Sequence, residues 1–427
     1  MLLQFNFTNF GSFEGETSLD MRASGSNELS YHVRAIGKEK VLPVASIYGA
    51  NASGKSTVYS AFEFMSLYVS QSFYLTDEKK VKGTKMLSTK PFAMSASKDK
   101  PSEFEVNYIT TVNGRCKYIN YGFMLDKDGV CEEWLRINSK TGVIRNHEYK
   151  TLFHRIRGLN TEYGNTLDKF RHNIEISLSE RVLLLSLGAK LKVKELADIR
   201  DWFLENETID CSNYLFDGLE AKIIPDGIVD NIDLKNHLIE FINSFDSSII
   251  DLEFEKAPKS DSKDEDSYLV FAIHESKEKD MRIRIPFDDE SSGTIKMFLL
   301  YQVFNDVLRN GSLLFADELD IKLHPLLMRN ILLTMADPSK NPNNAQLIFT
   351  THNTVYMDMG LLRRDEIWFT EKDNNVSDLY SLSDFIDPTG EKVRKDANYE
   401  KNYLLGRYGA IPNLTNLLGD SDNGWAN

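Results

Sequence analysis

The chain has 427 residues, a length at which two or three structural units are expected. Hydrophobic residues make up 41% of the chain and charged residues 27%, which excludes a disordered or collagen-like protein. Lys and Arg number 50 and Asp and Glu 64, so the formal net charge of -14 excludes a cationic field over the whole molecule and leaves only a local patch for any contact with nucleic acid.

The first predicted elements form a strand, a loop and a helix. Apolar residues alternate with polar ones over residues 3–7, which predicts a strand, and the pattern ends at a turn over residues 9–11. A short apolar run over residues 41–48 predicts a second strand. A glycine-containing turn follows it, and residues 55–69 then show helical spacing.

The turn between that strand and that helix carries the strongest motif of the chain. Residues 49–56 read Gly-Ala-Asn-Ala-Ser-Gly-Lys-Ser, which matches G-x-x-x-x-G-K-[ST]. In such a phosphate loop, backbone N–H groups surround phosphate oxygens, Lys55 reaches the outer phosphates and Ser56 offers its hydroxyl to Mg²⁺. A chance glycine-rich turn would rarely match all four fixed positions. The residues expected to bind the nucleotide are Gly49, Asn51, Ala52, Ser53, Gly54, Lys55, Ser56 and Thr57.

The middle of the chain changes character twice. Between residues 103 and 137, three segments with period-two alternation are separated by turn residues, which predicts an antiparallel meander. From about residue 152 to residue 245 the apolar spacing is mostly helical, so we expect a helical lobe inserted at residues 141–267. Its end, residues 256–267, is charged and rich in serine and is expected to be a mobile loop. Strand-like alternation returns at residue 268.

Residues 290–294 read Glu-Ser-Ser-Gly-Thr and precede a helical pattern over residues 295–308. A serine hydroxyl and a glycine N–H at the start of a helix, here Ser291 and Gly293, can form a site for an anion. The same residues are also explained as a simple helix cap.

Another apolar strand is predicted at residues 313–316, and it ends in two adjacent carboxylates, Asp317 and Glu318. Because side chains alternate along a strand, the two carboxylates should point to different sides. Asp317 is then expected to hold Mg²⁺ together with Ser56, while Glu318 acts as the general base for the attacking water. Acidic residues at the end of a strand are common, so the phosphate loop is what makes this interpretation favourable.

The strand predicted at residues 345–351 ends in His352, which is expected to contact the terminal phosphate. A surface histidine at a strand end is the alternative. Near the carboxyl terminus, Tyr399, Tyr403 and Arg407 are spaced by four residues, which on a helix would give one face suited to a partner protein. Ordinary packing of a terminal helix is the other interpretation of that spacing.

Cys116, Cys131 and Cys211 are an odd number of cysteines at wide spacings, which favours reduced thiols over a disulfide framework or a zinc site. The first residues lack a basic targeting segment, and no apolar run reaches the roughly 18 residues that span a bilayer. We therefore expect a cytoplasmic protein that makes no membrane contact.

The order of phosphate loop, long insertion, Asp-Glu strand and strand-terminal histidine resembles the ABC-type ATPase heads of the SMC, RecF and OLD group. Residues 9–13, Asn-Phe-Gly-Ser-Phe, are similar to the early "NF" turn of that group. The Leu-His-Pro at residues 323–325 and the segment at residues 403–412 resemble AAA15/AAA21-type ATPases from bacterial abortive-infection and anti-phage systems of the RloA, AbiL and PARIS type. The resemblance covers about residues 1–137 and 268–427.

This resemblance implies an α/β fold: a P-loop ABC-type ATPase head, with a mixed sheet and an antiparallel β meander, and an inserted helical lobe. Its halves would be residues 1–140 and 268–427, around the insertion at 141–267. In the family, the signature serine and glycine of one subunit close on the nucleotide of the other, so Ser291 and Gly293 are expected to bind the partner's ATP.

Two departures from the family pattern matter. The first signature glycine is Ser292 and the glutamine position is Thr294, which puts the rate of hydrolysis in question. The residues that would contact the base are not identified by sequence, so ATP is favoured over GTP by the resemblance alone.

The expected function is that of a switch subunit that binds and hydrolyses ATP with Mg²⁺ and dimerises around it. The resemblance implies a homo-oligomer that controls a separate effector encoded nearby, often a nuclease, in defence against phage, with a phage component as the trigger. The alternatives are a RecF- or SMC-like DNA-repair ATPase and a scaffold with little ATPase activity. The stretch after His352 shows no acid constellation of a Toprim nuclease, so we expect the chain itself not to cut nucleic acid.

Overall fold

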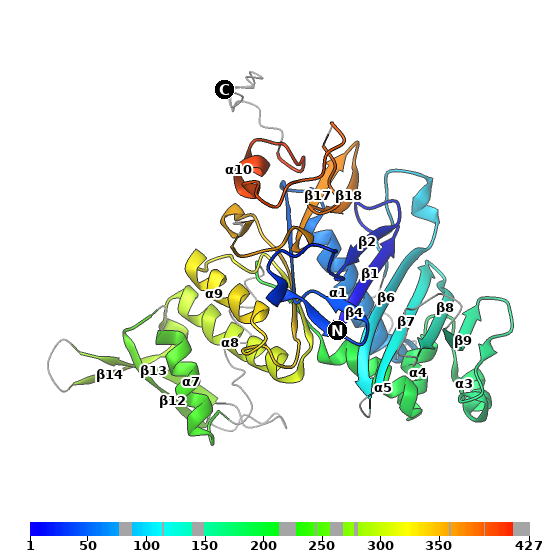
Figure 1. The fold of residues 1–427 in the computed structure, drawn as a ribbon. Helices are drawn as coiled ribbons and strands as arrows, with labels where there is room; N and C mark the ends of the chain where they lie inside the picture. The colour runs from blue at the N-terminus through cyan, green and yellow to red at the C-terminus, as the bar shows by residue number, and fades with distance from the viewer. Residues whose placement is uncertain are drawn as a thin grey trace.

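The computed structural model describes residues 1–76, 88–112, 115–138, 149–212, 228–243, 246–256, 268–276, 281–357, 360–387 and 389–412. They form an α/β fold in which a mainly parallel sheet and an antiparallel sheet lie on either side of one long helix (Figure 1).

The central sheet is built from strands of both halves of the chain. Its order is β11 (Glu207–Asp210), β15 (Leu313–Asp317), β16 (Gln346–Thr350), β5 (Val44–Gly49), β17 (Ile367–Asp373) and β18 (Val376–Ser381). The first five run parallel and β18 is antiparallel to β17, so the sheet is mixed, as predicted. Because the carboxyl ends of parallel strands meet at one edge, Gly49, Asp317 and Thr350 are brought together there.

The strand predicted at residues 41–48 begins only at Val44. Pro43, which has no N–H group to donate to a ladder, separates it from the short hairpin of β3 (Arg34–Ile36) and β4 (Glu39–Val41).

The second sheet is antiparallel and contains the predicted meander. Its order is β10 (Glu162–Tyr163), β9 (Lys150–Ile156), β8 (Gly129–Asn138), β7 (Arg115–Asp126), β6 (Ser102–Val112), β1 (Leu2–Thr8) and β2 (Thr17–Asp20). The meander of β6, β7 and β8 is confirmed, and so is the strand predicted at residues 3–7. The sheet also extends past the meander on both sides, through β1–β2 and through β9–β10.

Helix α1 (Lys55–Gln71) confirms the predicted helix and packs between the two sheets. The ring of Phe62 lies 5.3 Å from that of Phe5 on β1 and 5.8 Å from that of Phe315 on β15. One buried side chain near the middle of α1 therefore lies against both sheets, which holds the helix in place between them. Three further helices contribute buried residues to the same core as α1: α3 (Arg171–Ser177), α4 (Leu184–Lys190) and α5 (Lys194–Glu205).

The opposite face of the central sheet supports a second core. Along β15, Leu313 and Phe315 belong to the core around α1, whereas Leu314 and Ala316 belong to the second one. The helices of this second core are α7 (Ile232–Asn243), α8 (Ser292–Asn310), α9 (Pro325–Ala336) and α10 (Tyr399–Leu404). The helix predicted at residues 295–308 is confirmed by α8.

A small antiparallel sheet accompanies α7. It consists of β12 (Ile249–Lys256), β13 (Tyr268–Glu275) and β14 (Arg282–Pro286), and Figure 1 shows it beside α7 on the side of α8 away from the central sheet. Two of its strands, β13 and β14, confirm the strand-like alternation predicted from residue 268 onward.

The prediction of a helical lobe at residues 141–267 is corrected by four strands in this range. β9 and β10 extend the antiparallel sheet, β11 is an edge strand of the central sheet and β12 belongs to the small sheet. Strand β11 was not predicted from the sequence because it has no apolar run, and Ile209 is its only buried residue. Residues 139–148 and 257–267 lie outside the described residues. The predicted start of the insertion, at residue 141, and most of the loop expected at residues 256–267 therefore lie outside them as well. The division of the chain into three units stays a prediction.

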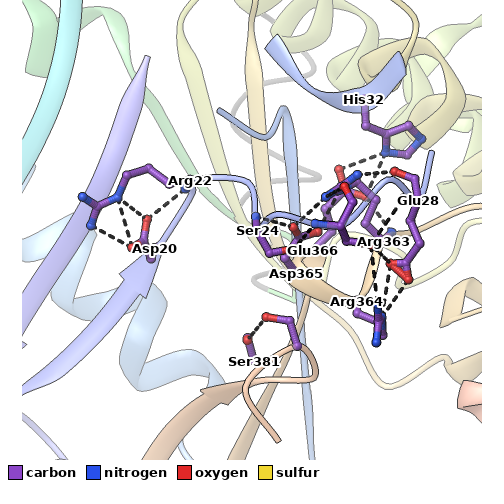
Figure 2. A network of polar contacts seen from close by, with 12 residues as sticks. Asp20, Arg22, Ser24, Glu28, His32, Arg363, Arg364, Asp365, Glu366 and Ser381 are labelled. Carbon is purple, nitrogen blue, oxygen red and sulfur yellow. Dashed lines mark hydrogen bonds and ion pairs between the residues drawn. The ribbon is translucent and has the colours of Figure 1, made fainter. Parts of the chain in front are cut away.

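A buried polar network joins the segment before β3 to the start of β17 (Figure 2). Nδ1 of His32 lies 2.9 Å from the carboxylate of Glu366, and the exposed fraction of each residue is 0%. The guanidinium of Arg363 donates to Asp365 over 2.8 Å. Buried charges are tolerated where they are paired in this way, so the network ties the amino-terminal segment to the central sheet.

No disulfide joins Cys116, Cys131 and Cys211 to one another. Within the part of the chain that the structure describes, no helix is both long and apolar enough to cross a membrane.

Candidate nucleotide-binding site

The phosphate loop, residues 49–56, connects β5 to α1, and two of its positions require glycine. Gly49 has φ 155°, and a Cβ there would lie 2.5 Å from Ser53 Oγ and from the carbonyl oxygen of Thr370. Gly54 has φ 123°, and its Cβ would lie 2.9 Å from the ring of Phe13. No side chain fits at these distances, so both glycines let the loop pack against its neighbours.

Hydroxyl groups fasten the loop on both sides. Ser53 Oγ lies 2.5 Å from Thr370 Oγ1 of β17. At the start of α1, Thr57 Oγ1 lies 3.5 Å from Ser12 Oγ, which in turn accepts a hydrogen bond of 2.7 Å from Ser377. The "NF" turn and the β17–β18 hairpin therefore both border the loop.

Lys55 is buried beneath the loop. Its ammonium group donates to the carbonyl oxygens of Gly49 at 2.9 Å and of Ala50 at 3.1 Å. Burial lowers the pKa of Lys55 to about 8, although the carboxylates of Asp317 and Glu318 oppose that shift. A phosphate group would supply the negative charge that this partly desolvated ammonium favours.

Asp317 and Glu318 are both held by Thr350, on the neighbouring strand β16. The hydroxyl of Thr350 donates to Oδ1 of Asp317 over 2.5 Å and accepts the backbone N–H of Glu318 at 2.8 Å. Glu318 has φ 50°, so the chain turns sharply after the strand. Asp317 stays buried while the side chain of Glu318 is partly exposed.

His352 faces Glu318 across the edge of the sheet. Its Nε2 lies 4.0 Å from Oε1 of Glu318. Burial, and then the charge of Lys55, lower the pKa of His352. The imidazole is therefore neutral at neutral pH and can donate one hydrogen bond and accept another.

One cavity of about 530 Å³ brings most of these groups together. It is lined by Ser12, Asn51, Ala52, Gly54, Lys55, Ser56, Thr57, Glu318, His352 and Lys372. A second cavity of about 950 Å³ shares Asn51, Ala52, His352 and Lys372 with it and is bounded on its far side by the carboxyl-terminal residues 403–412.

The donors for a metal are modest in number. Ser56 lines the first cavity, whereas Asp317 ends β15, which β16 separates from β5, and is not among the lining residues. The described residues contain no cluster of three acidic, histidine or cysteine side chains that could hold a metal ion. This set suits Mg²⁺, which is usually bound by one or two protein oxygens together with phosphate oxygens and water.

Ser291 and Gly293 do not line this cavity. Ser291 caps the start of α8, where its Oγ accepts the N–H of Thr294 over 3.1 Å. A Cβ at Gly293 would meet nothing closer than 3.7 Å, so no contact within the chain requires glycine there. The role of these two residues toward a partner's nucleotide stays a prediction.

The packing interpretation of the terminal aromatic residues is confirmed, and the partner-face interpretation is wrong. Tyr399 is 2% and Tyr403 7% exposed, and Tyr403 stacks on Phe369 of β17 with 5.3 Å between ring centroids. Helix α10 ends at Leu404, so Arg407 does not continue its face. The side chains face the second core because β17 offers an aromatic surface there.

Three residues near the site were not predicted from the sequence: Thr350, Thr370 and Lys372. Thr350 and Thr370 are single threonines on strands remote in sequence from the motifs they support. Lys372 lies at the end of β17 and lines both cavities. A threonine at the carboxyl end of a strand beside a motif strand is a pattern that fits Thr350, whereas Thr370 lies in the middle of β17.

Comparison with known proteins gives one family and one fold neighbour to report. Residues 44–358 match the model of the family described as "AAA domain, putative AbiEii toxin, Type IV TA system". Among solved structures, the Smc head domain with an extended coiled coil, bound to the C-terminal domain of ScpA, from Pyrococcus furiosus, matches with 13% sequence identity and a TM-score of 0.44. That match covers 89% of this chain and 96% of the other. No curated protein matches.

Proposed function

We propose that this chain, which belongs to the family of AAA domains reported above, is a switch that closes in pairs around ATP and opens after hydrolysis. The phosphate loop and the strands β15 and β16, which lead to Glu318 and His352, lie inside the matched residues. The observation that supports this proposal is the position of the signature residues. Lys55, Glu318 and His352 line one cavity, whereas Ser291 and Gly293 lie outside it. A second chain would bring its own helix start, which can bind an anion, to the phosphates.

Each residue has a task that its surroundings support. Mg²⁺ held by Ser56 and Asp317 would neutralise phosphate charge, and Thr350 keeps the Asp317 carboxylate oriented for this. The ammonium of Lys55 exchanges the carbonyls of Gly49 and Ala50 for the outer phosphate oxygens.

The hydrolytic step then falls to Glu318 and His352. The partly exposed carboxylate of Glu318 accepts the proton of the attacking water. His352, neutral at neutral pH because its pKa is lowered, donates a hydrogen bond to the terminal phosphate without adding charge repulsion toward Lys55. Pairing of two heads excludes bulk water from both sites at once, which strengthens these contacts.

The finer part of the proposal concerns the partner. The family description mentions a toxin of a toxin–antitoxin system, and the sequence resembles ATPases of abortive-infection and anti-phage systems. We therefore infer that the closed pair controls a separate effector, a nuclease by resemblance, encoded next to this gene. The formal charge of -14 favours a protein partner over nucleic acid along most of the surface.

The test uses Glu318→Gln, which keeps the shape of the side chain and removes the base. Sedimentation of this variant with MgATP should show pairs that ADP does not support, and wild type should pair only transiently. A Glu318→Gln head that binds ATP and stays single at all protein concentrations would contradict the pairing proposal.

A further inference from the structure

Three side chains form a hydrogen-bonded relay at the start of α8. Thr294 Oγ1 donates to Oδ2 of Asp246 over 3.1 Å. Ser291 Oγ lies 2.8 Å from Thr294 Oγ1 and accepts the N–H of Thr294 at 3.1 Å. Asp246 comes from the turn between α7 and β12, so the relay joins the signature serine to another part of the chain.

The charge state of Asp246 determines which hydroxyl donates and which accepts in each hydrogen bond of this relay. Burial raises the pKa of Asp246, but hydrogen bonds from Ser248 and Thr294 outweigh it, and the pKa lies below its ordinary value. Asp246 is therefore an ionised group that only accepts, and it takes the single hydroxyl proton of Thr294. The hydroxyl of Ser291 must then donate its own proton to Thr294 Oγ1, because Thr294 has none left to give.

We propose that Asp246 is a positioning residue that holds the hydroxyl proton of Ser291 turned inward, so that the signature serine engages a phosphate only after this relay is broken. A phosphate oxygen can only accept, so Ser291 has to redirect its proton to bind one. The proposal rests on the proposed function, in which Ser291 meets the ATP of a second copy. Asp246 thereby raises the ATP concentration at which two heads close, by about two- to tenfold, the worth of one neutral hydrogen bond.

The signature segment, residues 290–294, is also anchored by a second contact from the same part of the chain. Glu290 accepts a hydrogen bond of 2.7 Å from His274 Nε2 of β13. Asp246 lies between α7 and β12, and His274 lies on β13. Both anchors therefore come from the group of α7 and the small sheet, which Figure 1 shows beside α8.

The decisive variant is Asp246→Asn, made in the Glu318→Gln background that holds ATP. Oδ1 of Asp246 accepts both the N–H of Ser248 at 3.2 Å and its hydroxyl at 2.6 Å. The asparagine oxygen has to stay at that position, so its amide nitrogen takes the place of Oδ2 and donates to Thr294. Thr294 then donates to Ser291, and the Ser291 proton becomes free for a phosphate.

Asp246→Asn should therefore lower the ATP concentration for half-maximal pairing by about two- to tenfold. A merely structural role of Asp246 predicts the opposite sign, because a weakened turn would make pairing harder. Thr294→Val removes the hydroxyl that traps the Ser291 proton and should shift pairing in the same direction, which gives an independent arm if Asp246→Asn folds poorly.

Asp337→Asn is the matched control. Asp337 accepts the N–H and the hydroxyl of Ser339, each at 2.8 Å, in the same Asp-x-Ser arrangement, but it follows α9 and has no link to the signature segment. It should leave the ATP midpoint unchanged. An unchanged or higher midpoint in both Asp246→Asn and Thr294→Val overturns the relay, whereas absence of ATP-dependent pairs in the Glu318→Gln parent overturns the proposed function and the relay with it.

Discussion

The hydroxyl of Thr350 bridges Asp317 and Glu318, donating to the carboxylate of the first over 2.5 Å and accepting the backbone N–H of the second at 2.8 Å. One side chain on the neighbouring strand thus orients both the acid that we propose for Mg²⁺ and the turn that carries the proposed base. A group in this position should matter to catalysis although it touches no substrate.

We predict that Thr350→Val lowers the steady-state ATPase rate by about tenfold to a hundredfold, the usual cost of losing an outer-shell partner of a metal ligand. The Mg²⁺ concentration for half-maximal activity should rise, because the Asp317 carboxylate is no longer held. Thr350→Ser keeps the hydroxyl and serves as the control. Equal Mg²⁺ dependence in Thr350→Val and wild type would show that Thr350 only supports the strand.

Lys55 and Glu318 should fail in different ways. Lys55→Ala removes the charge that holds the outer phosphates and should abolish ATP binding, whereas Glu318→Gln should bind ATP and not turn it over. Equilibrium binding of a fluorescent ATP analogue and single-turnover hydrolysis separate the two steps. Hydrolysis by Glu318→Gln at the wild-type rate would mean that another group is the base.

The affinity for ATP should depend on pH through Lys55. Its pKa is about 8, lowered by burial, and phosphates bind its charged form. Affinity is therefore full below about pH 8 and falls as the pH rises further, by up to about tenfold per unit. Binding measured from about pH 7.5 to pH 9.5 tests this, and Lys55→Arg, which stays charged, should flatten the curve whatever its affinity. A wild-type affinity that is constant over this range contradicts the assignment.

The buried pair of His32 and Glu366 should be important for stability. Removing the imidazole by His32→Ala leaves the buried carboxyl group of Glu366 without this hydrogen-bond partner and should cost about 1–3 kcal/mol in the free energy of unfolding. Glu366→Gln keeps the shape and an acceptor for the Arg363 N–H, so it should cost less. Urea denaturation followed by circular dichroism measures both, and equal losses would argue that packing rather than charge dominates here.

The sequence predicted the parts of the site that are contiguous and missed the parts that come from elsewhere. The phosphate loop combines its residues in eight consecutive positions, so its strand and helix context could be predicted together. Thr350, Thr370 and Asp246 each act through contacts with residues far along the chain, and a single polar residue carries no pattern.

The spacing of apolar residues also gave wrong predictions where packing against distant parts of the chain determines which side chains are buried. Tyr399 and Tyr403 lie four residues apart, which fits a surface face and a buried face equally well, and the aromatic side of β17 selected the second. Strand β11 has one buried residue in four, too few for alternation to be seen, yet it pairs in register with β15 along its whole length.

We propose that each nucleotide contacts the phosphate loop of one chain and the signature segment of the other, and mixing two inactive variants tests this. Ser291→Arg places a bulky cation at the start of α8 but leaves its own phosphate loop intact, and Lys55→Ala lacks phosphate binding but keeps an intact signature segment. If the two parts meet only across a pair, a mixed pair contains one complete site, formed by the loop of the first variant and the helix start of the second.

Mixing equal amounts should therefore restore roughly a quarter of the wild-type ATPase rate, since about half of randomly formed pairs are mixed and each has one of two sites complete. Each variant alone, at the same total concentration, should remain inactive. Mixing Ser291→Arg with the double variant Lys55→Ala, Ser291→Arg is the control, because no pairing of these chains yields a complete site. Activity of Ser291→Arg alone, or no recovery in a mixture that sedimentation shows to contain mixed pairs, would mean that Ser291 does not serve the nucleotide of the other head.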